Sequence, residues 1–141
     1  MHEHLLITKS EKETQEAGEK LVQTLAPGSV VAMYGDLGAG KTAFVRGMTR
    51  GLGINFPVSS PTFNVVNEYP GKVPLFHFDM YRLGSADELF DIGWDDYLER
   101  GGICAVEWSE NVEEAFEPGT VKVNITKLGD TEREITVEVM E

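Results

Sequence analysis

The glycine-rich segment Gly35–Thr42, "GDLGAGKT", limits the folds open to this chain more than any other feature. It follows the apolar, β-prone run 29–34, "SVVAMY", and it precedes a segment in which Phe44 and Met48 share one helical face. A strand, a glycine loop and a helix in that order are the setting of a phosphate-binding loop. The sequence therefore predicts a strand that ends at this loop and a helix over about 41–52.

Each fixed position of the pattern Gly35-x-x-x-x-Gly40-Lys41-Thr42 has a chemical reason. Glycines allow a loop whose backbone N–H groups, together with a helix N-terminus, point at phosphate oxygens. The Lys41 ammonium can reach the terminal phosphates, and the Thr42 hydroxyl can coordinate Mg²⁺. A glycine-rich turn with an incidental lysine is the weaker interpretation, because the flanking strand and helix fit the motif. The pattern predicts a site for a nucleoside triphosphate with Mg²⁺.

An acidic residue at the end of an apolar strand is the usual metal holder in such a site, and two candidates exist. The run "ICAVE" ends at Glu107, and the run "LFHFD" ends at Asp79 after an interruption by His77. Ligands gather beyond the carboxyl ends of parallel strands, so both acids are expected at the edge that carries the glycine loop. Glu107 is the better metal candidate by pattern, and Asp79 could orient water or accept a proton. For each acid alone, a solvent-facing strand end is an equal alternative, and the pattern leaves the division of roles open.

Helical and extended patterns alternate along the first part of the chain, and extended patterns dominate its end. Residues 10–13, "SEKE", match a capping box, and apolar residues then recur at helical spacing until Pro27-Gly28. We expect a single P-loop NTPase-like α/β domain over residues 1–141, with a mixed, mostly parallel sheet flanked by helices and with antiparallel C-terminal strands. The expected helices are 11–26, 41–52, a short one that begins after Ser85, and 95–100, with a turn or short helix over 110–116; the expected strands are 5–8, 29–34, 63–69, 73–79, 103–107, 121–128 and 133–140.

The charge and the cysteine content exclude some classes of partner and compartment. Acidic residues outnumber basic ones 24 to 12, for a net charge of −12, which disfavours direct binding to a nucleic-acid backbone. A nucleic acid would therefore be held by another subunit. Cys104 is the single cysteine of the 141 residues, so a disulfide framework is excluded and a reducing compartment is expected. The sequence shows no signal-type core and no apolar run of membrane length, which favours a cytoplasmic protein without a membrane partner.

Two other classes of nucleotide-binding protein fit the sequence less well. A guanine-nucleotide switch needs a guanine-reading acid, and in "TKLGD", Thr126 to Asp130, the acid stands one residue too far along, in a predicted hairpin. A small-metabolite kinase usually adds an acceptor pocket and an arginine-bearing lid, whereas this chain has only five arginines and no lid insertion. A minimal ATPase that serves a protein assembly is the remaining interpretation.

Four further segments, taken with the glycine loop and in the same order, resemble the TsaE family of small bacterial P-loop ATPases. They are "VSSPTFNVVNEY", "FHFDMYRL", "DELFDIGWDDYL" and "AVEWSE", and the resemblance extends over about 10–139. It implies a Mg-dependent ATPase required for threonylcarbamoyladenosine modification of adenosine 37 in tRNAs that read codons beginning with A. It also implies TsaD and TsaB as partners, whose complex would be reset by ATP hydrolysis, with tRNA bound only through them. The alternative is an ATP-gated assembly factor whose hydrolysis is incidental.

The resemblance also implies roles for individual residues. Lys41, Asp79 and Thr62 would be catalytic, with Thr62 in a switch-like loop that senses the terminal phosphate. Thr42 and Glu107 would hold Mg²⁺. Apart from the resemblance, we expect a partner surface at 89–97 and at the loop 59–62, with a solvated face as the alternative for the acidic segment. The residues expected to bind the nucleotide are Gly35, Gly38, Ala39, Gly40, Lys41 and Thr42 at the phosphates, and Ser10 and Arg133 near the adenine or ribose. The next residue after Thr42 is Ala43, and no nucleotide contact is assigned to it.

Overall fold

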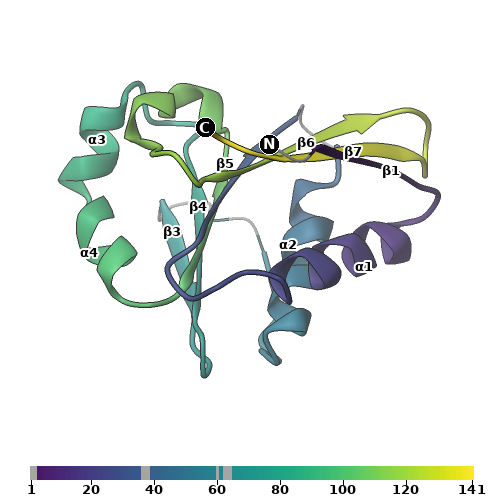
Figure 1. Ribbon diagram of the computed structural model, residues 1–141, viewed down its shortest axis with the longest axis horizontal. Coiled ribbons are helices and arrows are strands. Elements are labelled where there is room, and N and C mark those ends of the chain that lie inside the picture. Colours follow the sequence, from purple (N-terminus) through teal and green to yellow (C-terminus); the bar gives the residue numbers. More distant parts are fainter. Residues whose placement is uncertain (1–2, 36–38, 60, 62–64) are drawn as a thin grey trace.

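The computed structural model describes residues 3–35, 39–59, 61 and 65–141. They form a seven-stranded sheet in the order β1-β7-β6-β2-β5-β4-β3, with helices on both faces (Figure 1). The strands are β1 (Glu3–Thr8), β2 (Val30–Tyr34), β3 (Val66–Tyr69), β4 (Leu75–Asp79), β5 (Ile103–Glu107), β6 (Val121–Lys127) and β7 (Arg133–Val139). The helices are α1 (Glu11–Val22), α2 (Lys41–Gly51), α3 (Ala86–Asp91), α4 (Trp94–Glu99) and the 3₁₀ turns η1 (Ser109–Asn111) and η2 (Glu113–Ala115).

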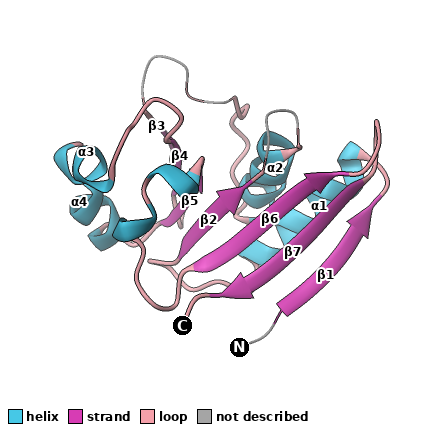
Figure 2. Cartoon of the chain, turned by 90° about the horizontal axis from the view of Figure 1, so that it is seen from above, coloured by secondary structure: helices cyan, strands magenta, loops and turns pink. Residues whose placement is uncertain are grey.

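The centre of the sheet is parallel and both of its ends are antiparallel. The strands β6, β2, β5 and β4 run in one direction, β3 returns against β4, and β7 and β1 continue antiparallel from β6. Figure 2 shows β2, β6, β7 and β1 side by side, with α1 and α2 behind them. The predicted mixed α/β fold is confirmed, including the antiparallel C-terminal hairpin.

Two apolar cores lie on opposite faces of the sheet, because successive strand residues point to opposite sides. Along β4 and β5, Leu75 and Ile103 pack with α2, while Phe76 and Cys104 pack with α3 and α4. Trp94 fills the second core, and its ring packs edge-on against the ring of Phe78, with 79° between the two planes. The sheet is therefore buried on both faces at its parallel centre, as crossover connections require.

The helices α1 and α2 lie unusually close together, because glycines stand where they cross. A Cβ atom at Gly47 would overlap the carbonyl oxygen of Gln15, and one at Gly18 would overlap the carbonyl oxygen of Phe44. The backbones can approach to this distance only if neither position carries a side chain. This close contact fixes α2, which begins directly after Gly40, against α1.

Several predicted element ends differ from the structure. The helix expected to reach residue 26 ends at Val22, and just beyond that end the Thr24 hydroxyl donates a hydrogen bond to the Leu21 carbonyl, a local bond that competes with further helix. The strand expected to begin at 73 begins at Leu75. The strand expected to begin at 63 has its first described residue at Val66. Ser85, after which a short helix was expected, makes no side-chain cap bond in the part described, and Glu88 accepts a hydrogen bond from the Gly84 N–H.

Candidate active site

The turn between β2 and α2 needs glycine at both of its described ends. Gly35 has φ 145°, and a Cβ atom there would overlap the carbonyl oxygen of Ile125. Gly40 has φ 105° and is the N-cap of α2. Residues that carry a side chain rarely adopt these left-handed backbone conformations. The backbone itself therefore requires both glycines of the motif. Gly38, which was predicted to bind phosphate, lies outside the described residues.

The N-terminus of α2 faces this turn and suits an anion. Within the described ranges, no side chain caps the helix and its first turn holds no acidic residue. The positive end of the helix dipole is therefore not compensated from within the helix. A phosphate group placed there would accept hydrogen bonds from backbone N–H groups at the site where the helix dipole favours negative charge.

Lys41 is buried at the start of α2 and is held by two contacts. Its ammonium donates a 2.7 Å hydrogen bond to the Gly35 carbonyl and lies 4.1 Å from the centre of the Trp108 ring. Trp108 follows β5 with φ 58°, a strained conformation for a bulky residue, and its ring packs against that of Tyr81. The indole thus covers the lysine. The left-handed backbone at Trp108 gave no signal in the sequence.

Position 43, the third residue of α2, differs from the two polar residues before it. Ala43 is buried on the helix, and its methyl group can neither donate nor accept a hydrogen bond. Among the first three residues of α2, Thr42 alone has a side-chain hydroxyl. A hydrogen bond between residue 43 and a nucleotide could therefore come only from the backbone of Ala43.

The two acids predicted at the strand ends are direct neighbours across the sheet. Asp79 of β4 and Glu107 of β5 are partners in the parallel register, so their side chains leave the same face. Burial raises the pKa of Asp79, and the negative charge of Glu107 raises it further, while a hydrogen bond from the Tyr81 N–H opposes both effects. The sheet therefore brings a buried and a half-buried carboxyl group to the edge where the glycine loop begins.

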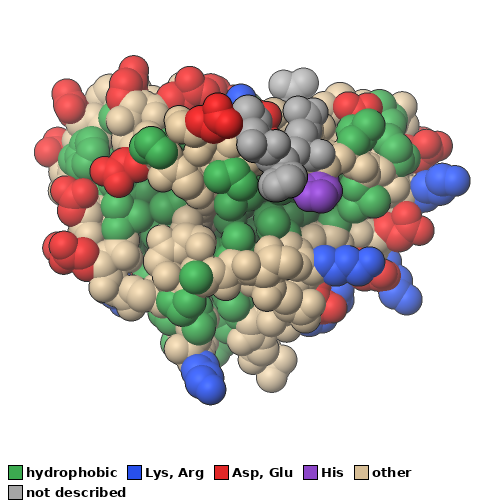
Figure 3. Space-filling model, viewed as in Figure 1, with side chains coloured by type: hydrophobic (Ala, Val, Ile, Leu, Met, Phe, Trp, Pro, Cys, Tyr) green, Lys and Arg blue, Asp and Glu red, His purple; other side chains and the backbone are tan. Residues whose placement is uncertain are grey.

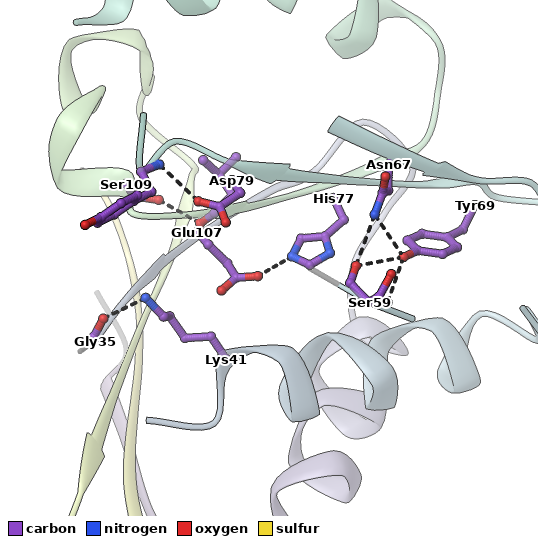
Figure 4. A network of polar contacts seen from close by, with 11 residues as sticks. Gly35, Lys41, Ser59, Asn67, Tyr69, His77, Asp79, Glu107 and Ser109 are labelled. Atoms are coloured by element: carbon purple, nitrogen blue, oxygen red, sulfur yellow. Dashed lines mark hydrogen bonds and ion pairs between the residues drawn. The ribbon is translucent and has the colours of Figure 1, made fainter. Parts of the chain in front are cut away.

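His77 joins this pair from the same face of β4. It is fully buried, and its Nε2 lies within hydrogen-bond distance of the Glu107 carboxylate. In Figure 4 that carboxylate lies between the His77 ring and the Lys41 ammonium. The partner of His77 lies thirty residues further along the chain, so the local pattern could not reveal this pair.

These groups fit Mg²⁺ that is shared with a nucleotide better than they fit a metal held by protein alone. Over the described ranges, no group of three or more His, Cys, Asp or Glu residues could enclose a metal ion. Mg²⁺ commonly binds through one or two carboxylates together with substrate phosphates and water. A cation held partly by ATP would need only such an incomplete set of oxygen ligands, and Glu107 and the Thr42 hydroxyl stay the predicted ones.

Arg133 lies against the glycine loop, although 94 residues separate it from its partner there. Its Nε donates a 2.8 Å hydrogen bond to the Ala39 carbonyl, and its Nη1 donates to the carbonyls of Gly129 and Glu132 in the β6–β7 turn. The guanidinium thus links the hairpin to the loop. Its predicted contact with adenine or ribose stays a prediction.

Ser10 begins α1, and its hydroxyl accepts a 3.1 Å hydrogen bond from the Glu13 N–H. One turn later, the Thr14 side chain lies 3.7 Å from the position of a Cβ atom at Gly40. The first turn of α1 is therefore close to the glycine loop, and the nucleotide contact of Ser10 stays a prediction. Thr62, predicted to sense the terminal phosphate, lies outside the described residues.

Comparison with known proteins identifies the family. A sequence model of the family described as "Threonylcarbamoyl adenosine biosynthesis protein TsaE" matches residues 8–135. The chain belongs to the TsaE family. It is 40% identical to the TsaE protein of Treponema pallidum over 131 residues, which cover 93% of this chain and 97% of that protein. It is 42% identical to the TsaE protein of Bacillus subtilis over 130 residues, which cover 92% and 81%.

A solved structure agrees with the family assignment. The crystal structure of Bacillus subtilis YdiB superimposes with a TM-score of 0.85 at 35% sequence identity, and the match covers 99% of this chain and 87% of that one. The resemblance inferred from the sequence motifs is thus confirmed, and so is the fold. The names of the family and of these relatives concern biosynthesis of threonylcarbamoyladenosine in tRNA.

Proposed function

We propose that this chain is a Mg-dependent ATPase required for threonylcarbamoyladenosine modification of adenosine 37 in tRNAs reading codons that begin with A. ATP hydrolysis resets a complex of TsaB and TsaD between turnovers, and the chain contacts tRNA only through these partners. The observation that carries the proposal is a buried lysine at a helix N-terminus that no described side chain caps, beside two carboxyl groups at the same sheet edge. That arrangement supplies positive charge for phosphates and oxygen ligands for a cation.

The residues of the site have separate roles in nucleotide binding, in metal binding and in hydrolysis. Lys41 and the amides of the loop 35–42 stabilise the negative charge of the transferred phosphoryl group. Thr42 and Glu107 hold Mg²⁺, which when bound would neutralise charge on the phosphates. Asp79 orients the attacking water, a role that its position beside Glu107 and its raised pKa support. Thr62 senses the terminal phosphate.

A comparison of ATP with a non-hydrolysable analogue tests the resetting role. The purified chain is combined with TsaB, TsaD, tRNA and the other substrates, and modified tRNA is counted per TsaD over many turnovers. With ATP we expect repeated turnover, and with the analogue we expect the reaction to stop after about one turnover. Full multiple turnover with the analogue would eliminate hydrolytic resetting and favour an ATP-gated assembly factor. A phosphorylated small molecule among the products would instead favour a kinase.

Replacing Arg133 by alanine is expected to weaken ATP binding about tenfold, or about 1.4 kcal/mol. The reason is that the Ala39 carbonyl loses its 2.8 Å hydrogen bond and the loop is no longer tied to the β6–β7 turn. Titration calorimetry with ATP and Mg²⁺ measures the change. Arg46→Ala is the matched control, since Arg46 lies on α2 in an exposed ion pair with Glu11. Equal affinities of both variants and the unchanged chain would contradict a role for Arg133 at the loop.

The surface of α3 and α4 is our proposed partner contact, with a correction to the residues expected there. Exposed carboxylates gather at this end of the molecule (Figure 3), and Phe90 and Ile92 are exposed among them. Leu89 and Trp94, which were counted as part of this surface, are buried in the core between the helices and the sheet.

Along the described chain, no helix has the length and apolar character needed to cross a membrane. We place the protein in the cytoplasm, where its tRNA-modifying partners would act.

A further inference from the structure

His77 occupies a position where the fold alone calls for an apolar residue. Leu75, two residues earlier on the same face of β4, belongs to the core beneath α2. His77 itself is fully buried, and its Nδ1 has no hydrogen-bond partner among the residues that the structure describes. Burying a polar ring with one nitrogen unpaired costs free energy that a leucine would avoid. The bond from the other ring nitrogen, Nε2, is the only described contact that offsets this cost.

The register of the sheet places Nε2 of His77 next to Glu107. His77 lies opposite Ala105 of β5, and Glu107 is the next residue of β5 on the same face. The small side chain of Ala105 leaves room for the imidazole to lie diagonally between the strands, a distance that long side chains can span. Since a carboxylate has only acceptors, Nε2 carries the proton and donates to one oxygen of Glu107.

The second oxygen of Glu107 is left facing the phosphate loop. In Figure 4 this oxygen points towards the side of the site from which Lys41 enters, and Lys41 donates to the Gly35 carbonyl instead. Within the described ranges, Lys41 forms no ion pair with Glu107. A buried carboxylate that lacked any other hydrogen-bond donor would favour such an ion pair. An ion pair of that kind would occupy both the ammonium meant for phosphate and the carboxylate meant for the cation.

We propose that His77 is a positioning residue: its Nε2–H holds one Glu107 oxygen, so that the other stays available to the divalent cation and Glu107 does not form an ion pair with Lys41. This role rests on the proposed function, because it concerns the cation that accompanies ATP. Hydrogen bonds to ligating carboxylates commonly orient them, and loss of such a partner typically lowers metal affinity 10- to 100-fold.

The test measures Mn²⁺ affinity by electron paramagnetic resonance, using the full chain with a non-hydrolysable ATP analogue. His77→Leu keeps bulk but removes the donor, and we expect Mn²⁺ to bind 10- to 100-fold more weakly. Binding of the analogue in excess chelator should not change, because Lys41 and the loop amides are untouched. In the Glu107→Gln background, His77→Leu should cause no further loss of Mn²⁺ affinity, because the two residues act as one unit.

A second pair of variants decides the matter even if His77→Leu does not fold. His77→Gln can place an amide N–H near the position of Nε2, whereas the shorter His77→Asn cannot reach Glu107. We expect Gln to retain most of the Mn²⁺ affinity and Asn to lose it. Equal affinity for the two variants, or unchanged affinity in a folded His77→Leu protein, would overturn the positioning role. If the unchanged chain bound the analogue without any dependence on Mn²⁺, the proposed function itself would fail, and the role of His77 with it.

Discussion

Replacing Lys41 by alanine is expected to lower the rate of partner-stimulated ATP hydrolysis by about 100- to 1000-fold, the usual cost of removing one preorganised donor from a developing charge. The ammonium is buried, 2.7 Å from the Gly35 carbonyl and covered by the Trp108 ring, so its position is set before ATP arrives. Water that enters the space left by the side chain would not reproduce a fixed positive charge. Release of phosphate under saturating ATP and Mg²⁺ measures the loss.

Two controls separate loss of the charge from loss of the fold. Lys41→Met keeps an apolar stem without the ammonium, and it should lose as much activity as the alanine variant while melting near the temperature of the unchanged chain. Lys122→Ala removes another lysine that lies over an aromatic ring, 4.9 Å from the centre of Tyr34, and it should keep full activity. Normal hydrolysis by Lys41→Ala would rule out the ATPase assignment.

Replacing Gly47 by alanine is expected to destabilise the protein by about 3 kcal/mol, at the upper end of the cost of overpacking. The new Cβ atom would overlap the Gln15 carbonyl oxygen, which belongs to the backbone of α1 and cannot move without the helix. Alanine favours a helix over glycine by up to about 1 kcal/mol, so the propensity term opposes this effect and is the smaller of the two. Thermal unfolding followed by circular dichroism should show a midpoint about 10 °C lower.

The matched control for this substitution is Gly129→Ala. Gly129 lies in the turn between β6 and β7, and a Cβ atom there would meet no heavy atom within 4 Å. Its melting temperature should stay within about 2 °C of that of the unchanged chain, as for most surface substitutions. A Gly47→Ala protein as stable as the Gly129→Ala protein would show that α1 and α2 can separate at no cost, contrary to their packing in the structure.

Local patterns predicted most of the elements, because the physical signals for them lie within a few residues. The strand Ile103–Glu107 has its predicted bounds, and α2 begins at Lys41 as the motif requires. Helix ends were predicted less well, since they depend on single hydrogen bonds such as that of Thr24 to the Leu21 carbonyl. Burial within the predicted partner surface 89–97 was misjudged for Leu89 and Trp94, because a short acidic stretch does not reveal which side of two brief helices faces the sheet.

The sequence by itself determined the phosphate-binding loop, the acids at the ends of two strands and the membership of the TsaE family, since these depend on residue type and local spacing. Only the tertiary structure decided that His77 binds Glu107, that Trp108 covers Lys41 and that Arg133 holds Ala39. Each of these contacts joins residues 30 or more positions apart, through strand order and register. Such contacts form only when the sheet closes, and no local pattern in the chain records which strands become neighbours.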